Sequence, residues 1–84
     1  MGVCTRRKVT IYPGILNDKL EKTVFELEMS SNCTLHDVIL SLCLDPGAVG
    51  FLVMDGCVVN IDQAPITILG NSRDLDIFPF MEGG

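Results

Sequence analysis

Alternating apolar and polar positions predict two β-strands in the first third of the chain. Across residues 8–12, Val9 and Ile11 fall on one face and polar side chains on the other, which is the period of a strand. Residues 24–29 alternate in the same way with two glutamates on one face, so that face is expected to meet water. The two segments therefore predict an N-terminal hairpin with a long connecting loop.

The next apolar pattern has the period of a helix. Thr34 is a good N-cap, and Asp37 three residues later is a shorter version of the capping-box glutamate. Apolar residues then recur at helical spacing and form one stripe: Leu35, Val38, Ile39, Leu42 and Cys43. Asp45-Pro46-Gly47 ends the pattern. We expect a helix over residues 34–44 that covers one face of a sheet.

The second half of the chain contains the clearest hairpin signal. An apolar segment, residues 49–54, is followed by Asp55-Gly56, a type I′ turn dipeptide, and by a return strand over residues 58–61. Residues 66–69 are compatible with either a short strand or a 3₁₀ turn. A last strand is expected over residues 75–80.

This order of elements predicts a single α+β domain, with one main helix packed on a mixed sheet of four or five strands. It is the order of the ubiquitin-like β-grasp roll, in which the last strand lies centrally beside the first. Residues 1–7 are expected to form a flexible arm, residues 8–80 the domain, and residues 81–84 a flexible tail.

The net charge of the chain indicates which classes of binding partner are to be expected. The 84 residues have a net charge of −5, which argues against nucleic acid because phosphate contacts need a clustered basic face. Arg6, Arg7 and Lys8 form the one basic cluster, and a solvated arm explains it best. The acidic excess favours a protein partner with a basic docking surface. No apolar run approaches the ~20 residues of a membrane span and no signal peptide is visible, so we expect a cytoplasmic protein.

Metal and cofactor chemistry have little support in the sequence. The four cysteines are widely spaced, without the close pairs typical of zinc sites, and are expected to be free thiols. His36 lies in the first helical turn with no predicted partner, which favours a solvent-facing side chain over a catalytic base. No glycine-rich phosphate loop or nucleophile motif is present. We expect no bound metal and no bound cofactor.

The last residues are the most informative for function. Glycine at the final two positions, Gly83 and Gly84, serves no turn or cap but provides a narrow tail without side chains. The α-carboxylate of Gly84 is anionic at neutral pH and could attack a nucleotide phosphate. We therefore expect Gly84 to be the reactive end, with Glu82 and Gly83 threading a channel in a partner. A frayed terminus is the alternative.

The chain from residue 8 onward resembles the MoaD/ThiS group of sulfur carriers, the small subunit of molybdopterin synthase and its thiamin-pathway relative. Four features in the family's order form the resemblance: a helix opening on Thr34-Leu35, a hairpin turn at Asp55-Gly56, a last strand ending at Phe78-Pro79, and the closing Gly83-Gly84. The family usually has Asn-Gly at the hairpin and an acidic Gly-Asp-Glu or Gly-Asp-Asp before the last strand. This chain has Gly70-Asn71-Ser72-Arg73-Asp74 there, and Phe80 stands where a second proline is common.

The resemblance implies a protein cosubstrate rather than an enzyme, either free or as the small subunit of a synthase. An ATP-dependent activating enzyme would adenylate the Gly84 carboxylate, and a persulfide sulfur would replace AMP to leave a C-terminal thiocarboxylate. A sulfur-accepting synthase subunit would consume that sulfur in molybdopterin or thiamin biosynthesis. Phe78, Phe80 and Met81 are the candidate docking residues, since exposed aromatics are good interface anchors. For Phe78, packing in the core is an equal alternative.

Two other functions agree with the same residues. In a ubiquitin-like protein modifier, the activated Gly84 would join a lysine amine through an amide bond. In a β-grasp binding module without tail chemistry, the two glycines would be incidental. The pathway that receives the sulfur, its donor and the oligomeric state stay open.

Overall fold

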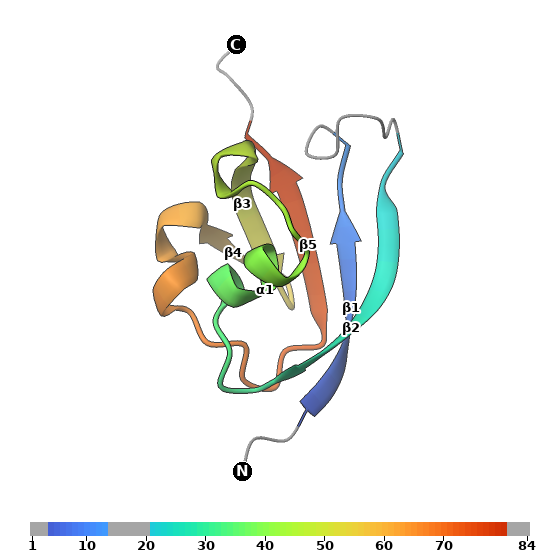
Figure 1. Ribbon diagram of the computed structural model, residues 1–84, viewed down its shortest axis with the longest axis vertical. Coiled ribbons are helices and arrows are strands. Elements are labelled where there is room, and N and C mark those ends of the chain that lie inside the picture. Colours follow the sequence, from blue (N-terminus) through green and yellow to red (C-terminus); the bar gives the residue numbers. More distant parts are fainter. Residues whose placement is uncertain (1–3, 14–20, 81–84) are drawn as a thin grey trace.

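The computed structural model describes residues 4–13 and 21–80 and has one five-stranded mixed sheet with a helix across one of its faces (Figure 1). In chain order the elements are β1 (Cys4–Ile11), β2 (Thr23–Ser30), α1 (Leu35–Ser41), η1 (Pro46–Ala48), β3 (Val49–Met54), β4 (Cys57–Asn60), η2 (Ile61–Ile66) and β5 (Asp74–Pro79). The expected α+β class, with one main helix and a mixed sheet, is confirmed.

The last strand lies in the middle of the sheet. The strand order is β2-β1-β5-β3-β4, and β5 runs parallel to β1 and antiparallel to β3. Its register with β1 pairs Val9 with Leu75 and Ile11 with Ile77, and these four side chains are all buried on the helix side. The prediction that the last strand lies centrally beside the first is therefore confirmed.

The core fills the space between the sheet and α1. Its buried apolar members come from every layer of the fold: Val9, Ile11, Leu35, Val38, Ile39, Leu44, Val49, Leu52, Ala64, Leu69, Leu75 and Ile77. The strand alternation predicted for residues 8–12 and 24–29 places Val9 and Ile11 in this core and leaves Glu26 and Glu28 exposed, as expected. An 84-residue domain buries only about 60–65% of the surface of its unfolded chain, so the core is thin.

The helix begins as the sequence predicts but ends sooner. Thr34 and Asp37 form a reciprocal capping box, with the Thr34 N–H donating to the Asp37 carboxylate at 2.9 Å and the Asp37 N–H to the Thr34 hydroxyl at 3.2 Å. The predicted end at residue 44 and the placement of Cys43 on the buried stripe are wrong, because Cys43 is exposed with φ of 57°.

A Schellman turn explains this early end. The Cys43 N–H donates to the Leu40 carbonyl at 3.0 Å and the Leu44 N–H to the Ile39 carbonyl at 3.1 Å. The turn brings the Leu44 side chain back into the core, to which Ile39 also belongs. A left-handed residue without glycine costs roughly 1–2 kcal/mol, and burying a leucine offsets this with about 1.5–3 kcal/mol.

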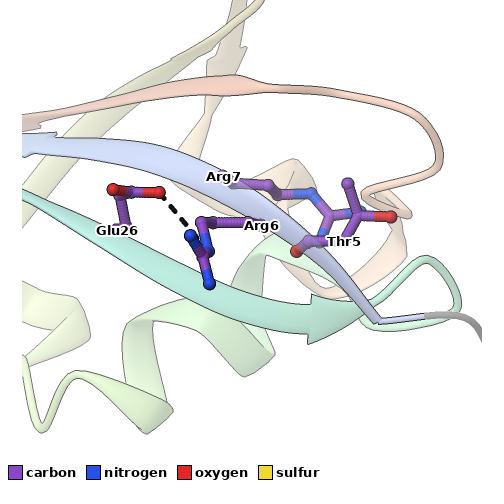
Figure 2. A network of polar contacts seen from close by, with 4 residues as sticks. All are labelled: Thr5, Arg6, Arg7 and Glu26. Atoms are coloured by element: carbon purple, nitrogen blue, oxygen red, sulfur yellow. Dashed lines mark hydrogen bonds and ion pairs between the residues drawn. The ribbon is translucent and has the colours of Figure 1, made fainter.

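The N-terminal segment is more ordered than its charges suggest. Residues 4–7, which the basic cluster indicates as part of a flexible arm, belong to β1, so that expectation is wrong for them; residues 1–3 lie outside the described part. Arg7 is only 1% exposed. Its guanidinium donates to four main-chain carbonyls: those of Thr5, Met29, Gly70 and Ser72, at 2.7–3.1 Å. Arg6, by contrast, points to the surface toward Glu26 (Figure 2).

The C-terminal half contains the predicted hairpin. Asp55 and Gly56 have φ of 50° and 87°, the positive values that a type I′ turn requires, and they join β3 to β4. Ile61, which the apolar pattern places in the return strand, instead begins η2. Of the two alternatives for residues 66–69, neither extends over the whole segment: η2 ends at Ile66, and Ile68 forms an isolated bridge with Thr34.

Candidate functional site

Three aromatic rings form a row on the open face of the sheet, the face away from α1. Phe78 on β5 is paired in register with Phe51 on β3, and its neighbour Ile77 is bonded to the Tyr12 N–H at the end of β1 at 2.9 Å. Because neighbouring residues of a strand point to opposite faces, burial of Ile77 under the helix places Phe78 on the open side. We call Tyr12, Phe78 and Phe51 the aromatic row.

The rings of the aromatic row are stacked. The Phe78 centroid lies 4.2 Å from that of Tyr12 and 4.6 Å from that of Phe51, with interplanar angles of 11° and 9°. All three side chains are half-buried, so each ring hides part of the next and leaves its remaining surface to solvent. Pairs of this kind contribute about 0.5–1.5 kcal/mol beyond their buried area. The row is therefore both a structural brace and an apolar surface.

The chain leaves the sheet immediately after this row. Phe80 follows β5, donates its N–H to the Ala48 carbonyl at 2.8 Å, and is 60% exposed. The register with β3 shifts between Val49 and Phe51, so Gly50 is the extra residue beside Pro79. A Cβ on Gly50 would lie 2.7 Å from the Pro79 carbonyl oxygen. The lack of a side chain at Gly50 thus lets the end of β5 lie directly on β3.

Carboxylates lie on the same face at the other end of β5. Asp55, Asp74 and Asp76 line a shallow depression of about 290 Å³ together with Lys8. The Asp55 carboxylate accepts the N–H of Asp74 at 2.9 Å and that of Arg73 at 3.0 Å. These two main-chain bonds, the Asp74 one first, hold the pKa of Asp55 below its ordinary value of 3.8. Asp55 therefore stays ionised at neutral pH and fastens the β3–β4 turn to the start of β5.

The structure brings together part of the predicted site. Phe78 lies in the aromatic row, on the open face instead of under the helix, and Phe80 lies exposed just beyond it. Met81, Glu82, Gly83 and Gly84 lie outside the described residues.

Side chains of the metal-binding and nucleophilic types are scattered in the described part of the chain. Residues 4–13 and 21–80 contain no group of three or more His, Cys, Asp or Glu side chains arranged to hold a metal ion. All four cysteines are free thiols, as expected, and three of them are exposed: Cys4, Cys43 and Cys57.

Three residues of this site are absent from the sequence-based expectations. The alternation of residues 8–12 predicts that Tyr12 lies on the face opposite Ile11. Its stacking on Phe78 could not be predicted, because it depends on which strand lies beside β1. Phe51 stands in a continuous apolar segment that has no alternation to assign its face. Gly50 gives no signal before the register of β3 and β5 is known.

In the described residues, no helix is both long and apolar enough to cross a membrane. Comparison with known proteins finds no matching family model, no matching curated protein and no matching solved structure.

Proposed function

We propose that this protein is a sulfur carrier of the MoaD/ThiS type on a β-grasp fold, with the carboxyl group of Gly84 as its reactive group. The observation that supports it best is the position of β5. This strand lies between β1 and β3 and ends at Pro79, beside the aromatic row. Because neighbours hold the strand on both sides, the segment after it departs from a defined point on an apolar surface.

The first reaction consumes ATP because a carboxylate is a poor acyl donor. A carboxylate oxygen of Gly84 attacks the α-phosphorus of ATP on an activating enzyme, pyrophosphate leaves, and an acyl adenylate forms. Holding the two reacting atoms at near-attack geometry is worth up to about 7–11 kcal/mol in favourable cases. Glu82 and Gly83 would thread the channel that brings Gly84 to the nucleotide.

The second reaction transfers sulfur. The terminal sulfur of a protein persulfide attacks the acyl carbon of Gly84, AMP leaves, and an acyl disulfide forms. A thiol of the sulfur donor then attacks the donor-side sulfur of that bond, which supplies two electrons and releases the thiocarboxylate while the donor becomes a disulfide. The thiocarboxylate sulfur passes to the substrate of a synthase, and hydrolysis of the acyl group restores the carboxylate.

Docking must come from the folded body. Fixing a tail residue costs roughly 1–2 kcal/mol of conformational entropy, which glycines cannot recover through side-chain contacts. Phe80, with Met81 as its neighbour in sequence, is the proposed anchor because it is exposed at the root of the tail. The aromatic row adjoins it, and the carboxylates of Asp55, Asp74 and Asp76 favour a partner whose docking surface is basic.

The deciding experiment examines the C-terminal peptide of protein isolated from its native cell. After treatment with a thiol alkylator and digestion with trypsin, cleavage after Arg73 yields residues 74–84, which contain no cysteine. Alkylation that the fragment spectra place on Gly84, and not on Met81, therefore reports a C-terminal thiocarboxylate. Tandem mass spectrometry is essential, because replacing oxygen with sulfur adds nearly the mass of one oxidation, and Met81 lies in the peptide.

An alkylated Gly84 is the expected result. A chain that continues past Gly84, or a carboxylate that stays unmodified after incubation with cell extract, ATP and cysteine, would overturn the proposal in favour of a binding module. Gly84 joined to a lysine would identify a protein modifier instead. Two control variants, one lacking Gly83-Gly84 and one with an alanine added after Gly84, should fold normally and acquire no sulfur.

A further inference from the structure

The outer edge of β2 carries main-chain groups that point away from the sheet. Lys8 and Tyr12 on β1 donate their N–H groups to β5, to the carbonyls of Arg73 at 2.8 Å and Ile77 at 2.9 Å. Alternate residues of a strand direct their main-chain groups to opposite sides, so Arg7 and Val9 direct theirs toward β2.

The partners of these two β1 residues on β2 are Leu27 and Phe25. These partners therefore face inward, and the N–H and C=O groups of Val24, Glu26 and Glu28 face outward. In the described residues β2 is the edge strand, with β1 as its single neighbour.

The side chains of β2 divide between two faces. Phe25, Leu27 and Met29 point to the helix side, where they pack against the core but are only half-buried. Val24, Glu26 and Glu28 are exposed on the open side. A strand added at this edge would thus meet apolar surface on one face and carboxylates on the other.

The charges along β2 determine which kind of added strand would bind best at this edge. Lys22 precedes β2, and β2 itself contains two glutamates and no lysine or arginine, so the strand contributes carboxylates without cations to this edge. Glu26 forms an ion pair with Arg6 at 3.5 Å in which both side chains are mostly exposed, and such surface pairs contribute about 0–1 kcal/mol (Figure 2). In the register of β1 with β2, Arg6 stands opposite Glu28 and Lys8 opposite Glu26. The two glutamates are exposed, so an incoming cation would share their carboxylates with these cations of β1.

We propose that the β2 edge binds an extended segment of another protein by strand addition, and that this segment alternates basic with apolar residues. Main-chain bonds to Val24, Glu26 and Glu28 would supply affinity, and the alternation would supply specificity. The apolar side chains would cover Phe25 and Leu27, while lysine or arginine would lie beside the glutamates. At Val24 this site adjoins the aromatic row, because Val24 and Tyr12 line one depression, but it does not depend on the tail chemistry.

The same glutamates disfavour the simplest competing occupant, a second copy of this chain. Antiparallel pairing of two β2 strands centred on Glu26 would place two Glu26 carboxylates side by side, and like charges directly opposite each other are destabilising. A basic strand replaces that repulsion with attraction.

The test is an NMR titration of the full chain with a blocked eight-residue peptide of alternating lysine and valine. In the free protein the amides of Val24, Glu26 and Glu28 should exchange rapidly with solvent, while those of Phe25 and Leu27 are protected. The peptide should shift and protect the first three. A matched peptide of alternating glutamate and valine should bind at least about tenfold more weakly, through charge repulsion.

Glu26→Pro removes one outward N–H and leaves the ladder with β1 intact, so the variant should fold and bind the lysine–valine peptide at least about tenfold more weakly. The double variant E26Q/E28Q should weaken binding severalfold without loss of main-chain bonds. Asp62→Asn on η2 removes a charge elsewhere and should leave binding unchanged.

Three outcomes would each overturn the proposal. The peptide could shift only the aromatic row, or its affinity could be unchanged in both Glu26 variants. The three amides could also become protected through concentration-dependent dimerisation of the protein. If the proline variant does not fold, amide protection in the unmodified protein and the affinity of E26Q/E28Q still decide it.

Discussion

Gly50 and Pro79 approach each other more closely than any residue with a side chain would permit. An added Cβ on Gly50 would lie 2.7 Å from the Pro79 carbonyl oxygen and 3.0 Å from the Phe80 Cα. Both obstacles are main-chain atoms of the segment that leads out of the sheet, so neither can rotate away. Glycine at position 50 therefore allows Pro79 and Phe80 to lie against β3.

Gly50→Ala should destabilise the domain by about 1–3 kcal/mol, because β3 and the end of β5 must separate to admit the methyl group. Urea unfolding measures the cost. Gly47→Ala is the matched control: its Cβ would meet the Asp45 carboxylate at 3.3 Å, an exposed side chain that can move, so a smaller loss is expected. Equal losses in the two variants would show that the close approach at Pro79 is unimportant.

Arg7 holds the connection before β5 in place. Arg7→Met should cost at least about 3 kcal/mol, because it removes the donors for the Met29, Gly70 and Ser72 carbonyls, and bonds to charged groups contribute about 1.5–3 kcal/mol each. Arg7→Lys keeps the charge but lacks the planar fork, so an intermediate loss is expected. The exposed Arg6→Met should lose no more than about 1 kcal/mol. Denaturant unfolding of the three variants tests this ranking.

Titration of the Asp55 carboxylate makes the free energy of unfolding depend on pH at acidic pH. Its pKa is lower in the folded protein than in the unfolded chain, so its contribution is complete above the ordinary value of 3.8 and is lost as pH falls through the lower folded pKa. Asp55→Asn tolerates the positive φ and keeps an acceptor oxygen, but it does not titrate. The variant should therefore lose less stability than the parent between pH 5 and pH 2, as urea midpoints will show. Parallel pH profiles would contradict the role of Asp55.

Alanine substitutions at Phe78 and Phe80 should distinguish a residue that stabilises the fold from one that docks a partner. Phe78→Ala removes the middle ring of the aromatic row and should cost about 2 kcal/mol, less than a fully buried phenylalanine. Phe80→Ala should change stability by no more than about 0.5 kcal/mol. If Phe80 is a docking anchor, its loss should lower kcat/KM for ATP–pyrophosphate exchange by an activating enzyme about tenfold or more. An unchanged exchange rate with Phe80→Ala would remove Phe80 from the proposed interface.

Local patterns predict the elements of this fold well where two independent signals coincide. The capping box at Thr34 and the turn at Asp55-Gly56 each combine a local hydrogen-bond or backbone requirement with adjacent apolar periodicity, and both are present. The end of α1 is different. Burial of Leu44 in the core determines where the helix ends, and the residues around Cys43 contain no pattern that predicts a left-handed conformation there.

Charge patterns are less reliable where tertiary structure can supply partners. The basic cluster predicts a solvated arm over Arg6, Arg7 and Lys8. This prediction is wrong for Arg7, because three carbonyls from distant positions in the chain accept hydrogen bonds from its guanidinium. The same limit applies to the candidate site. Phe78 and Phe80 stand out near the chain end, whereas Tyr12, Gly50 and Phe51 join them only through the pairing of β5 with β1 and β3.

The parallel pairing of β1 with β5 also governs how the protein bears mechanical load. The chain enters the domain through β1 and leaves it through β5, and the two strands are neighbours that run in the same direction. A pull on the two ends therefore slides one strand along the other, so the evenly spaced bonds from Lys8–Asp74 to Ile11–Ile77 share the force and must break together.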